Sequence, residues 1–281
     1  MSTRWRKSQV AQRKLVSTLC RAADERRAQG RYTEAEQLYR RALALAEVAC
    51  AGEEAAVICN NQAVLYKHMG RFDEAEQLYR RALSVLERSL TAEHVEIATI
   101  YHNLGGLEHA RGRFATGEPL ARRSVEIRER ALGPVHPDVA ADIAALAAIL
   151  SGQDKFDESE PLYRRALAIF EREYGPEHYE IAINLNNLAA LKYAQGCFEE
   201  AERLYRRSLA IKEKLLTPEH PDVAMTLNNL AVLCKVRSRF TEAGALYRRA
   251  LTIFQKSLGT THPKVIACRN NFARLMSRSL S

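Results

Sequence analysis

Histidine recurs at a fixed interval in this sequence, and clustered histidines are common metal ligands. Ligands of one zinc ion must converge, because a zinc–nitrogen bond is only about 2.0–2.1 Å long. Residues 42 positions apart in a chain of helical repeats are separated by a helix pair, and one helix contact already spans about 8–10 Å. We therefore predict that these histidines cap or wedge the loops between repeats, and that the chain holds no metal or other cofactor. The recurring histidines are His94, His136, His178, His220 and His262.

Adjacent arginine pairs form a second recurring group, and basic clusters can bind nucleic acid. The pairs contribute much of the formal net charge of +8. A glutamate stands four residues before most of the pairs, and a Glu-to-Arg pair at this spacing stabilises a helix by about 0.2–0.5 kcal/mol. Because no aromatic residues for base stacking lie between the arginines, the pattern favours a solvated, half-neutralised surface over RNA binding. The pairs are Arg40/Arg41, Arg80/Arg81, Arg122/Arg123, Arg164/Arg165, Arg206/Arg207 and Arg248/Arg249, and the glutamates are Glu36, Glu76, Glu118, Glu160 and Glu202.

Asparagine recurs at one position of the period and often at the position before it. Asparagine is a poor residue for a helix interior, so its recurrence suggests a specific role. A carboxamide both donates and accepts, so a row of carboxamides could hold the backbone N–H and C=O groups of an extended peptide. The alternative is that these amides bond to a neighbouring helix. The second asparagines of the row are Asn61, Asn103, Asn187, Asn229 and Asn271, and the first are Asn60, Asn186, Asn228 and Asn270.

Side chains around this asparagine row would determine which peptide binds. By helical phase Met225 shares the face of the asparagines, whereas Lys67, His109, Tyr193 and Lys235 lie one turn further along it. The candidate peptide-binding residues are therefore Asn60, Asn61, Asn103, Asn186, Asn187, Asn228, Asn229, Lys67, Tyr193, Met225 and Lys235.

A repeat provides the elements that carry these residues. The stretch that reads Gly-Arg-Phe-Asp-Glu-Ala from Gly70 recurs in variant form from Gly30 to Ser238, first after 40 residues and then every 42. Such a period indicates one supersecondary unit copied side by side. Apolar residues at three-to-four spacing predict a first and a second helix in each unit, as at 222–235 and 240–255. Glycines such as Gly70 predict the turn between the two helices.

The loops that lead into the first helices contain a second recurring motif. The sequence His-Pro-Asp-Val-Ala occurs at 136–140 and again at 220–224. Proline is compatible with a helix start, and an aspartate can cap the free N–H groups of the helix that follows. We therefore expect the aspartates Asp138 and Asp222 to cap these helices.

The order of small and aromatic residues in each unit resembles the tetratricopeptide repeat. The 42-residue period, the Leu-Gly-Pro-x-His-Pro-Asp-Val-Ala loop and the Leu-Asn-Asn-Leu-Ala stretch resemble the kinesin light chain type of that repeat, over about residues 30–277. The resemblance implies an all-α, right-handed superhelical solenoid of antiparallel helix pairs, a tetratricopeptide repeat array. It also implies that the first-helix asparagine lines a concave groove and holds bound peptide. The paired Lys/Arg of carboxylate-clamp members are absent, so binding of a chaperone tail is not expected.

The two ends of the chain depart from the repeat. We expect an N-terminal tail and polar first helix at 1–29, a tandem array at 30–262, and a C-terminal capping helix and tail at 263–281. The basic segment before residue 20 could also be a mitochondrial presequence, but it aligns as the first helix of repeat one. No apolar run approaches the ~18–20 residues of a membrane span. Six cysteines without Cys-x-x-Cys spacing predict reduced thiols in a cytoplasmic protein.

The sequence as a whole predicts a non-enzymatic scaffold or adaptor. No catalytic grouping of residues, and therefore no catalytic residue, can be placed at one point of such an array. We expect the asparagine row to bind a peptide or helical segment of a partner protein. Two alternatives remain open, namely a self-assembling, homo-oligomeric structural protein and, less favoured, an RNA-binding helical repeat that uses the arginines. Membrane insertion is not expected.

Overall fold

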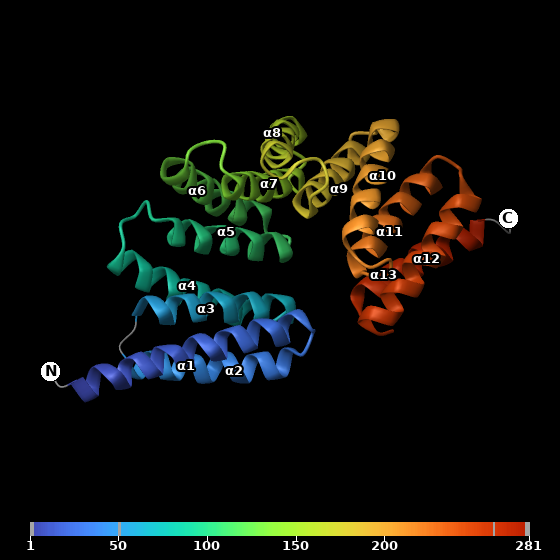
Figure 1. Cartoon of the computed structure of the whole chain (residues 1–281). Helices are drawn as coiled ribbons and strands as arrows, with labels where there is room; N and C mark the ends of the chain where they lie inside the picture. Colours follow the sequence, from blue (N-terminus) through green and yellow to red (C-terminus); the bar gives the residue numbers. More distant parts are fainter. Residues whose placement is uncertain (1–2, 50–51, 261, 279–281) are drawn as a thin grey trace. The chain divides into compact units, whose positions relative to one another are not determined.

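The chain folds into α-helices that follow one another in pairs (Figure 1). The computed structural model describes residues 3–49, 52–260 and 262–278, and these residues contain thirteen α-helices and no β-strand. The expectation of an all-α repeat array is confirmed. The helices are α1 (Thr3–Ala28), α2 (Tyr32–Val48), α3 (Gly52–His68), α4 (Phe72–Ser89), α5 (Val95–Ala110), α6 (Phe114–Leu132), α7 (Pro137–Ser151), α8 (Phe156–Tyr174), α9 (Tyr179–Ala194), α10 (Phe198–Leu215), α11 (Pro221–Val236), α12 (Phe240–Leu258) and α13 (Pro263–Arg278).

Two compact units make up the chain, one from Met1 to Gln153 and the other from Asp154 to Ser281. In the first unit, α1 packs on α2, α3 on α4, α5 on α6, and α6 on α7. In the second unit, α9 packs on α8 and α10, α11 on α10 and α12, and α13 on α12. The odd-numbered helices from α1 to α11 are the first helices of their repeats, and the even-numbered helices are the second. The predicted boundaries at residues 29 and 263 stay a prediction.

The turn between first and second helix needs a residue with positive φ. Gly196 supplies it between α9 and α10, at φ 79°. At the equivalent positions Asp154 and Ser238 adopt φ 59°, a region that costs a residue with a Cβ atom energy that glycine avoids. The sequence prediction of a left-handed turn residue is confirmed, and it holds even where glycine is replaced.

The in-phase histidines cap the first helices. The Nδ1 atom of His136 accepts the backbone N–H of Asp138 at 3.1 Å, and that of His220 accepts the N–H of Asp222 at 3.2 Å. His94, His178 and His262 accept in the same way from the residue two positions on. The prediction that the histidines cap the loops is confirmed. The expectation that Asp138 and Asp222 are the caps is wrong, because both lie inside the first turn, after the proline.

Small residues let each first helix approach its second helix closely. In α5 and α6, a Cβ atom added to Gly105 would lie 3.4 Å from the Cβ of Ala121, and one added to Gly117 would lie 3.3 Å from the Gly105 carbonyl oxygen. Elsewhere in the chain alanine fills the same places without exposure to solvent, as at Ala231 and Ala243. Larger side chains would push the helices apart, so these positions fix the spacing on which the packing depends.

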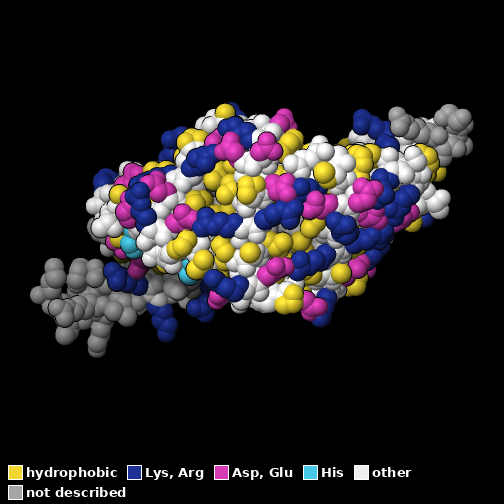
Figure 2. All heavy atoms as spheres, turned by 90° about the horizontal axis from the view of Figure 1, so that it is seen from above, with side chains coloured by type: hydrophobic (Ala, Val, Ile, Leu, Met, Phe, Trp, Pro, Cys, Tyr) yellow, Lys and Arg dark blue, Asp and Glu magenta, His cyan; other side chains and the backbone are white. Residues whose placement is uncertain are grey.

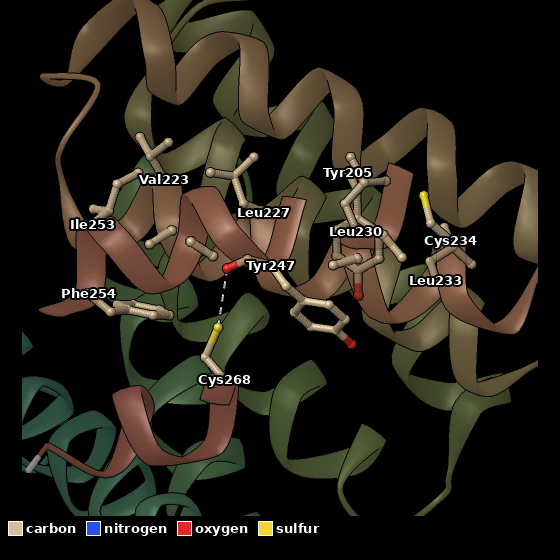
Figure 3. Close-up of a cluster of buried hydrophobic side chains, with 14 of the residues drawn as sticks. Tyr205, Val223, Leu227, Leu230, Leu233, Cys234, Tyr247, Ile253, Phe254 and Cys268 are labelled. Carbon is tan, nitrogen blue, oxygen red and sulfur yellow. Dashed lines mark hydrogen bonds between the residues drawn. The ribbon is translucent and has the colours of Figure 1, made fainter. Parts of the chain in front are cut away.

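The core of the second unit extends into the last helix (Figure 3). Leu230 of α11 and Tyr247 of α12 are both 1% exposed and lie in one cluster with Val265, Cys268 and Leu275 of α13. The Sγ of Cys268 lies 3.9 Å from the backbone carbonyl oxygen of Tyr247. The helix α13 is therefore packed on the array rather than appended to it.

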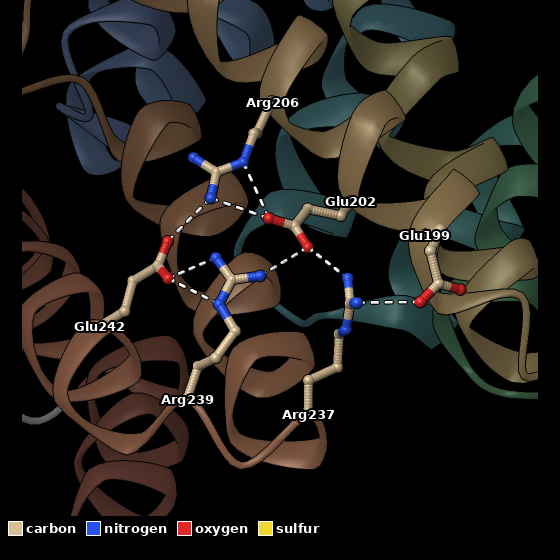
Figure 4. Close-up of polar contacts among 6 residues, drawn as sticks. All are labelled: Glu199, Glu202, Arg206, Arg237, Arg239 and Glu242. Atoms are coloured by element: carbon tan, nitrogen blue, oxygen red, sulfur yellow. Dashed lines mark hydrogen bonds and ion pairs between the residues drawn. The ribbon is translucent and has the colours of Figure 1, made fainter.

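Ion pairs connect neighbouring repeats outside the core. In the second unit Glu202 of α10 accepts from Arg206 on its own helix, at 3.0 Å, and from Arg237 and Arg239 of the α11–α12 turn, each at 2.7 Å (Figure 4). Burial raises the pKa of Glu202, but the hydrogen bonds from Arg239 and Arg206 outweigh burial and hold this pKa at about 2. Glu202 therefore remains ionised and bridges two repeats at neutral pH.

A lysine is buried where most other second helices carry an apolar residue. Lys212 of α10 is 1% exposed, and its Nζ donates to Thr226 Oγ1 at 3.0 Å. The equivalent residues Leu86, Phe170 and Phe254 belong to the hydrophobic core. Burial lowers the pKa of Lys212 to about 8, although the charge of Asp222 acts in the opposite direction. A desolvated ammonium group therefore weakens this point of the core.

The strained turn leads to a first prediction. Ser238→Gly should raise the free energy of unfolding of the second unit by about 1 kcal/mol, because glycine adopts positive φ without steric cost. The reciprocal change Gly196→Ser, at the equivalent turn of the same unit, should lower stability by a similar amount. Urea denaturation followed by circular dichroism measures both. Equal stability of the Ser238→Gly variant and the wild type would mean that the turn is not strained.

The buried lysine leads to a second prediction. Lys212→Leu should raise the melting temperature at pH 7, because replacing a buried charged group with an apolar one is often stabilising, by about 1–4 kcal/mol. In the wild type the folded-state pKa of about 8 lies below the unfolded value of about 10.4. The unfolded state therefore binds more protons between these values, and stability rises with pH across this window. The advantage of the Leu variant should shrink between pH 7 and pH 10, and an advantage that does not depend on pH would contradict this explanation.

Candidate functional site

Asparagines occupy equivalent places on the first helices and form what we call the Asn row, defined as Asn60 and Asn61 in α3, Asn103 in α5, Asn186 and Asn187 in α9, and Asn228 and Asn229 in α11. Most of these side chains are half-buried, and Asn186 is 6% exposed. Asn60, Asn61 and Asn103 belong to the first unit, and the other members belong to the second. In α7 of the first unit, Ala144 and Ala145 stand at the equivalent positions.

In the first unit the Asn row links two repeats. Asn60 of α3 accepts from Asn103 Nδ2 of α5 at 2.7 Å and donates to Asn61 Oδ1 at 3.2 Å. These bonds leave Asn61 Nδ2 and Asn103 Oδ1 without a hydrogen bond to any described residue. Part of the row therefore holds first helices together, and part of its hydrogen-bonding capacity remains for a ligand.

In the second unit the row joins a longer polar network. Asn186 Oδ1 accepts from Asn229 Nδ2 at 3.4 Å and from Thr226 Oγ1 at 3.3 Å, and Thr226 in turn accepts from the buried Lys212. The side-chain amide of Asn187 makes no hydrogen bond to the described part of the protein, although the residue is half-buried. The Oδ1 atom of Asn228 is buried and has no partner among the described residues.

The other predicted site residues lie beside the row. Met225 of α11 is half-buried and packs against the core of the second unit. Tyr193 of α9 packs on Phe198, with ring centroids 5.8 Å apart. Lys67 and Lys235 occupy equivalent positions in α3 and α11, and both are half-buried. Whether these residues and the asparagines contact a ligand stays a prediction.

Sequence reasoning missed a buried charged cluster in the first unit. Asp142 of α7 is 1% exposed, and its two carboxylate oxygens lie 2.7 Å from His102 Nδ1 of α5 and 2.8 Å from Arg128 Nε of α6. Arg128 also donates to Thr99 at 3.1 Å. His102 stands at the repeat position that Asn60 and Asn186 occupy elsewhere. The contact of His102 with Asp142 thus takes the place of the amide contact between these two first helices. The asparagine missing from position 102 was the signal that the sequence offered.

The surface of the first unit has a hollow between α1 and α3, at the repeat before the first asparagines of the row. A cavity of about 480 Å³ lies between the two helices. Arg21, at the repeat position that asparagine takes in α3, lines it together with Val57 and Cys20. Val57 is 46% exposed. The first unit therefore offers a partly apolar hollow beside a cation.

The arginine pairs lie on second helices and are largely neutralised. Arg80, Arg164 and Arg206 each lie 2.8 Å from the glutamate four residues earlier, as the sequence predicted. Arg207 reaches back to Glu171 of the preceding repeat at 2.6 Å, and Arg249 reaches Glu213 at the same distance. Figure 2 shows basic and acidic side chains interspersed on the face that it presents.

Metal sites, membrane-spanning helices and disulfides were also sought among the described residues. They contain no group of three or more His, Cys, Asp or Glu side chains that could hold a metal ion. Across residues 3–49, 52–260 and 262–278, no helix is both long and apolar enough to span a bilayer. The five described cysteines are unpaired, and Cys50 lies outside the described residues.

Comparison of structures places the fold among known repeat proteins. BtubC (BKLC) from P. vanneervenii is 25% identical to this chain, with a TM-score of 0.61, over 90% of this chain and 94% of the other. A kinesin light chain-like repeat protein from Podosopora anserina is 25% identical, with a TM-score of 0.57, over 70% and 93%. The apo form of RapI, at 13% identity and a TM-score of 0.63 over 93% and 96%, shares the fold.

Comparison of sequences identifies the repeat itself. No curated protein sequence matches the chain. The model of the tetratricopeptide repeat matches residues 14–88, 53–116, 96–171, 140–214, 180–243 and 222–279. Repeats of this kind generally form scaffolds for protein–protein interaction and are typically non-enzymatic. With the repeats covering nearly the whole length and kinesin light chain-like proteins among its structural neighbours, the chain belongs to the tetratricopeptide repeat family.

Proposed function

We propose that this protein is a non-enzymatic adaptor whose first helices bind a peptide or helical segment of a partner protein along the Asn row. The observation that carries the proposal is Asn187. Its side-chain amide lies half-buried on a first helix and makes no hydrogen bond to the described part of the protein. A peptide bond offers an N–H and a C=O, and one carboxamide can pair with both.

The hydrogen bonds within the row support this proposal rather than compete with it. Asn103 and Asn229 each use one amide N–H to reach the preceding first helix, which fixes the rotamer of the side chain. Fixed side chains lose less conformational entropy when a ligand binds. The carbonyl oxygen of Asn103 and the whole amide of Asn187 remain for the partner. Amides that bind the backbone of a peptide do not distinguish its sequence. Side chains beside the row must therefore determine which peptide is selected.

The arginine pairs favour protein over RNA as the partner. Arg206, for example, is engaged by both Glu202 and Glu242, each at 2.8 Å, so binding a phosphate there would break existing ion pairs. Self-assembly is the remaining alternative, and light scattering of the purified protein distinguishes a homo-oligomer from a monomeric adaptor. The unpaired described cysteines agree with a reducing, cytoplasmic setting for such an adaptor.

The proposal predicts the effect of a single substitution. A peptide is first selected from a random library on the immobilised wild-type protein. Asn187→Ala should then weaken its binding about fivefold to a hundredfold, because up to two hydrogen bonds of about 0.5–1.5 kcal/mol each are lost. The melting temperature should stay the same or rise slightly, because alanine is the better helix former. Isothermal calorimetry and a thermal melt on the same sample measure both quantities.

A buried asparagine of the same helix provides the control. Asn184 is 1% exposed and donates to the backbone carbonyl of Tyr163 at 2.8 Å. Asn184→Ala should therefore lower the melting temperature while the peptide affinity of the folded protein changes little. If Asn187→Ala instead melts early and retains its affinity, the row is a structural element and the proposed binding face is wrong.

A further inference from the structure

Lys67 of α3 and His109 of α5 occupy the same position in consecutive repeats and face a common space. Lys67 extends from α3 across to α5, where a Cβ atom added to Gly106 would lie 3.6 Å from the lysine Nζ. Gly106 and His109 are three residues apart on α5 and therefore share one side of that helix. The ammonium group thus lies against a bare stretch of backbone, next to the imidazole.

Neither side chain has an acidic partner among the described residues. Other basic side chains of the chain are paired: Arg111 lies 2.6 Å from both Glu76 and Glu108, and Lys192 lies 2.6 Å from Glu160. Burial lowers the pKa of Lys67. Burial, and then the charge of Lys67, lower the pKa of His109. Among the described residues, no acidic side chain compensates the charge of Lys67.

The imidazole is held in place by its neighbour. The ring of His109 packs edge-on against Phe114, with centroids 5.4 Å apart and an angle of 64° between the planes. Tyr193 and Phe198 form the equivalent aromatic pair in the second unit, at 5.8 Å. This contact restricts the orientation of the His109 ring, so its N–H donor is positioned before any ligand arrives.

The charge of the pair indicates which anion fits. At neutral pH Lys67 carries one positive charge and His109, with its lowered pKa, is neutral, so the pair matches a monoanion such as a carboxylate rather than a dianionic phosphate. Both residues lie in the last turn of their helices, where the helix dipole opposes an anion. A hydrogen bond to a charged group is the stronger of the two effects and outweighs this opposition.

We propose that Lys67 and His109 bind the side-chain carboxylate of an aspartate or glutamate in a partner peptide, with Gly106 leaving room for it. This inference rests on the proposed function, because it assigns an acidic residue to the peptide bound beside the Asn row of the first unit. Lys67 supplies the charge, and His109 donates a hydrogen bond from its N–H. The site gives the binding face a side-chain preference that the asparagines, which read backbone, cannot provide.

The test is selection from a random peptide library on the immobilised full-length protein, followed by sequencing. The wild type should enrich Asp or Glu at least threefold at one position of the selected peptides. Lys67→Met and Gly106→Val should each abolish that enrichment while still selecting peptides. Valine is compatible with the fold at position 106, because Val64 and Val232 stand at the same position of other repeats. Lys14→Met, which removes an exposed positive charge from α1 of the same unit, is the matched control and should leave the enrichment intact.

The possible results separate this inference from the proposed function. If neither the wild type nor any variant selects a peptide, the proposed function is wrong, and the inference fails with it. If the wild type selects peptides without an acidic preference, or if Lys67→Met retains that preference, the inference alone is overturned. A parallel library containing phosphoserine provides the last arm. Stronger enrichment of phosphoserine than of Asp and Glu would contradict the assignment to a carboxylate.

Discussion

The close approach of each first helix to its second helix is the constraint on which the rest of this structure depends. Alanine and glycine at the crossing points, such as Gly105 against Ala121, let the two backbones pack at short distance. With that spacing fixed in every repeat, equivalent residues of neighbouring repeats come to lie next to each other. A residue type that recurs in the sequence therefore becomes a row of contacts in space. The asparagine amides and the glutamate–arginine pairs that reach the next repeat are two such rows.

These rows stabilise the array in places where the apolar core does not reach. Glu202 connects α10 to the following turn through Arg237 and Arg239, and Asn60 connects α3 to α5 through Asn103. Where the repeat departs from its pattern, a different polar contact takes over. The ion pair of Asp142 with Arg128 is one example. The desolvation of such buried charges offsets much of the stability that their pairing contributes.

The sequence predicted the elements well because each is specified locally. Apolar spacing determines the helices, a glycine such as Gly196 determines the turn, and a glutamate four residues before Arg206 determines an ion pair within one helix. The capping atom was assigned to aspartate, because the sequence does not reveal that the histidine ring reaches the N–H two residues on. The burial of Lys212 was also missed, and the sequence left open whether asparagines such as Asn60 and Asn103 bond to a ligand or to a neighbouring helix. Both depend on which helix lies alongside, and that is a property of the tertiary structure.

The central claim, that a partner binds the first helices rather than the second, can be tested by photo-crosslinking. A benzophenone amino acid is placed singly at Val57 or Ala190, both exposed on first helices, and at Ser84 or Thr252, both exposed on second helices. Each protein is irradiated with a library-selected peptide at saturating concentration. The claim predicts crosslinked peptide from a first-helix position and background levels from Ser84 and Thr252. Crosslinking mainly from Ser84 or Thr252 would show that the partner binds the arginine-bearing surface and would contradict the claim.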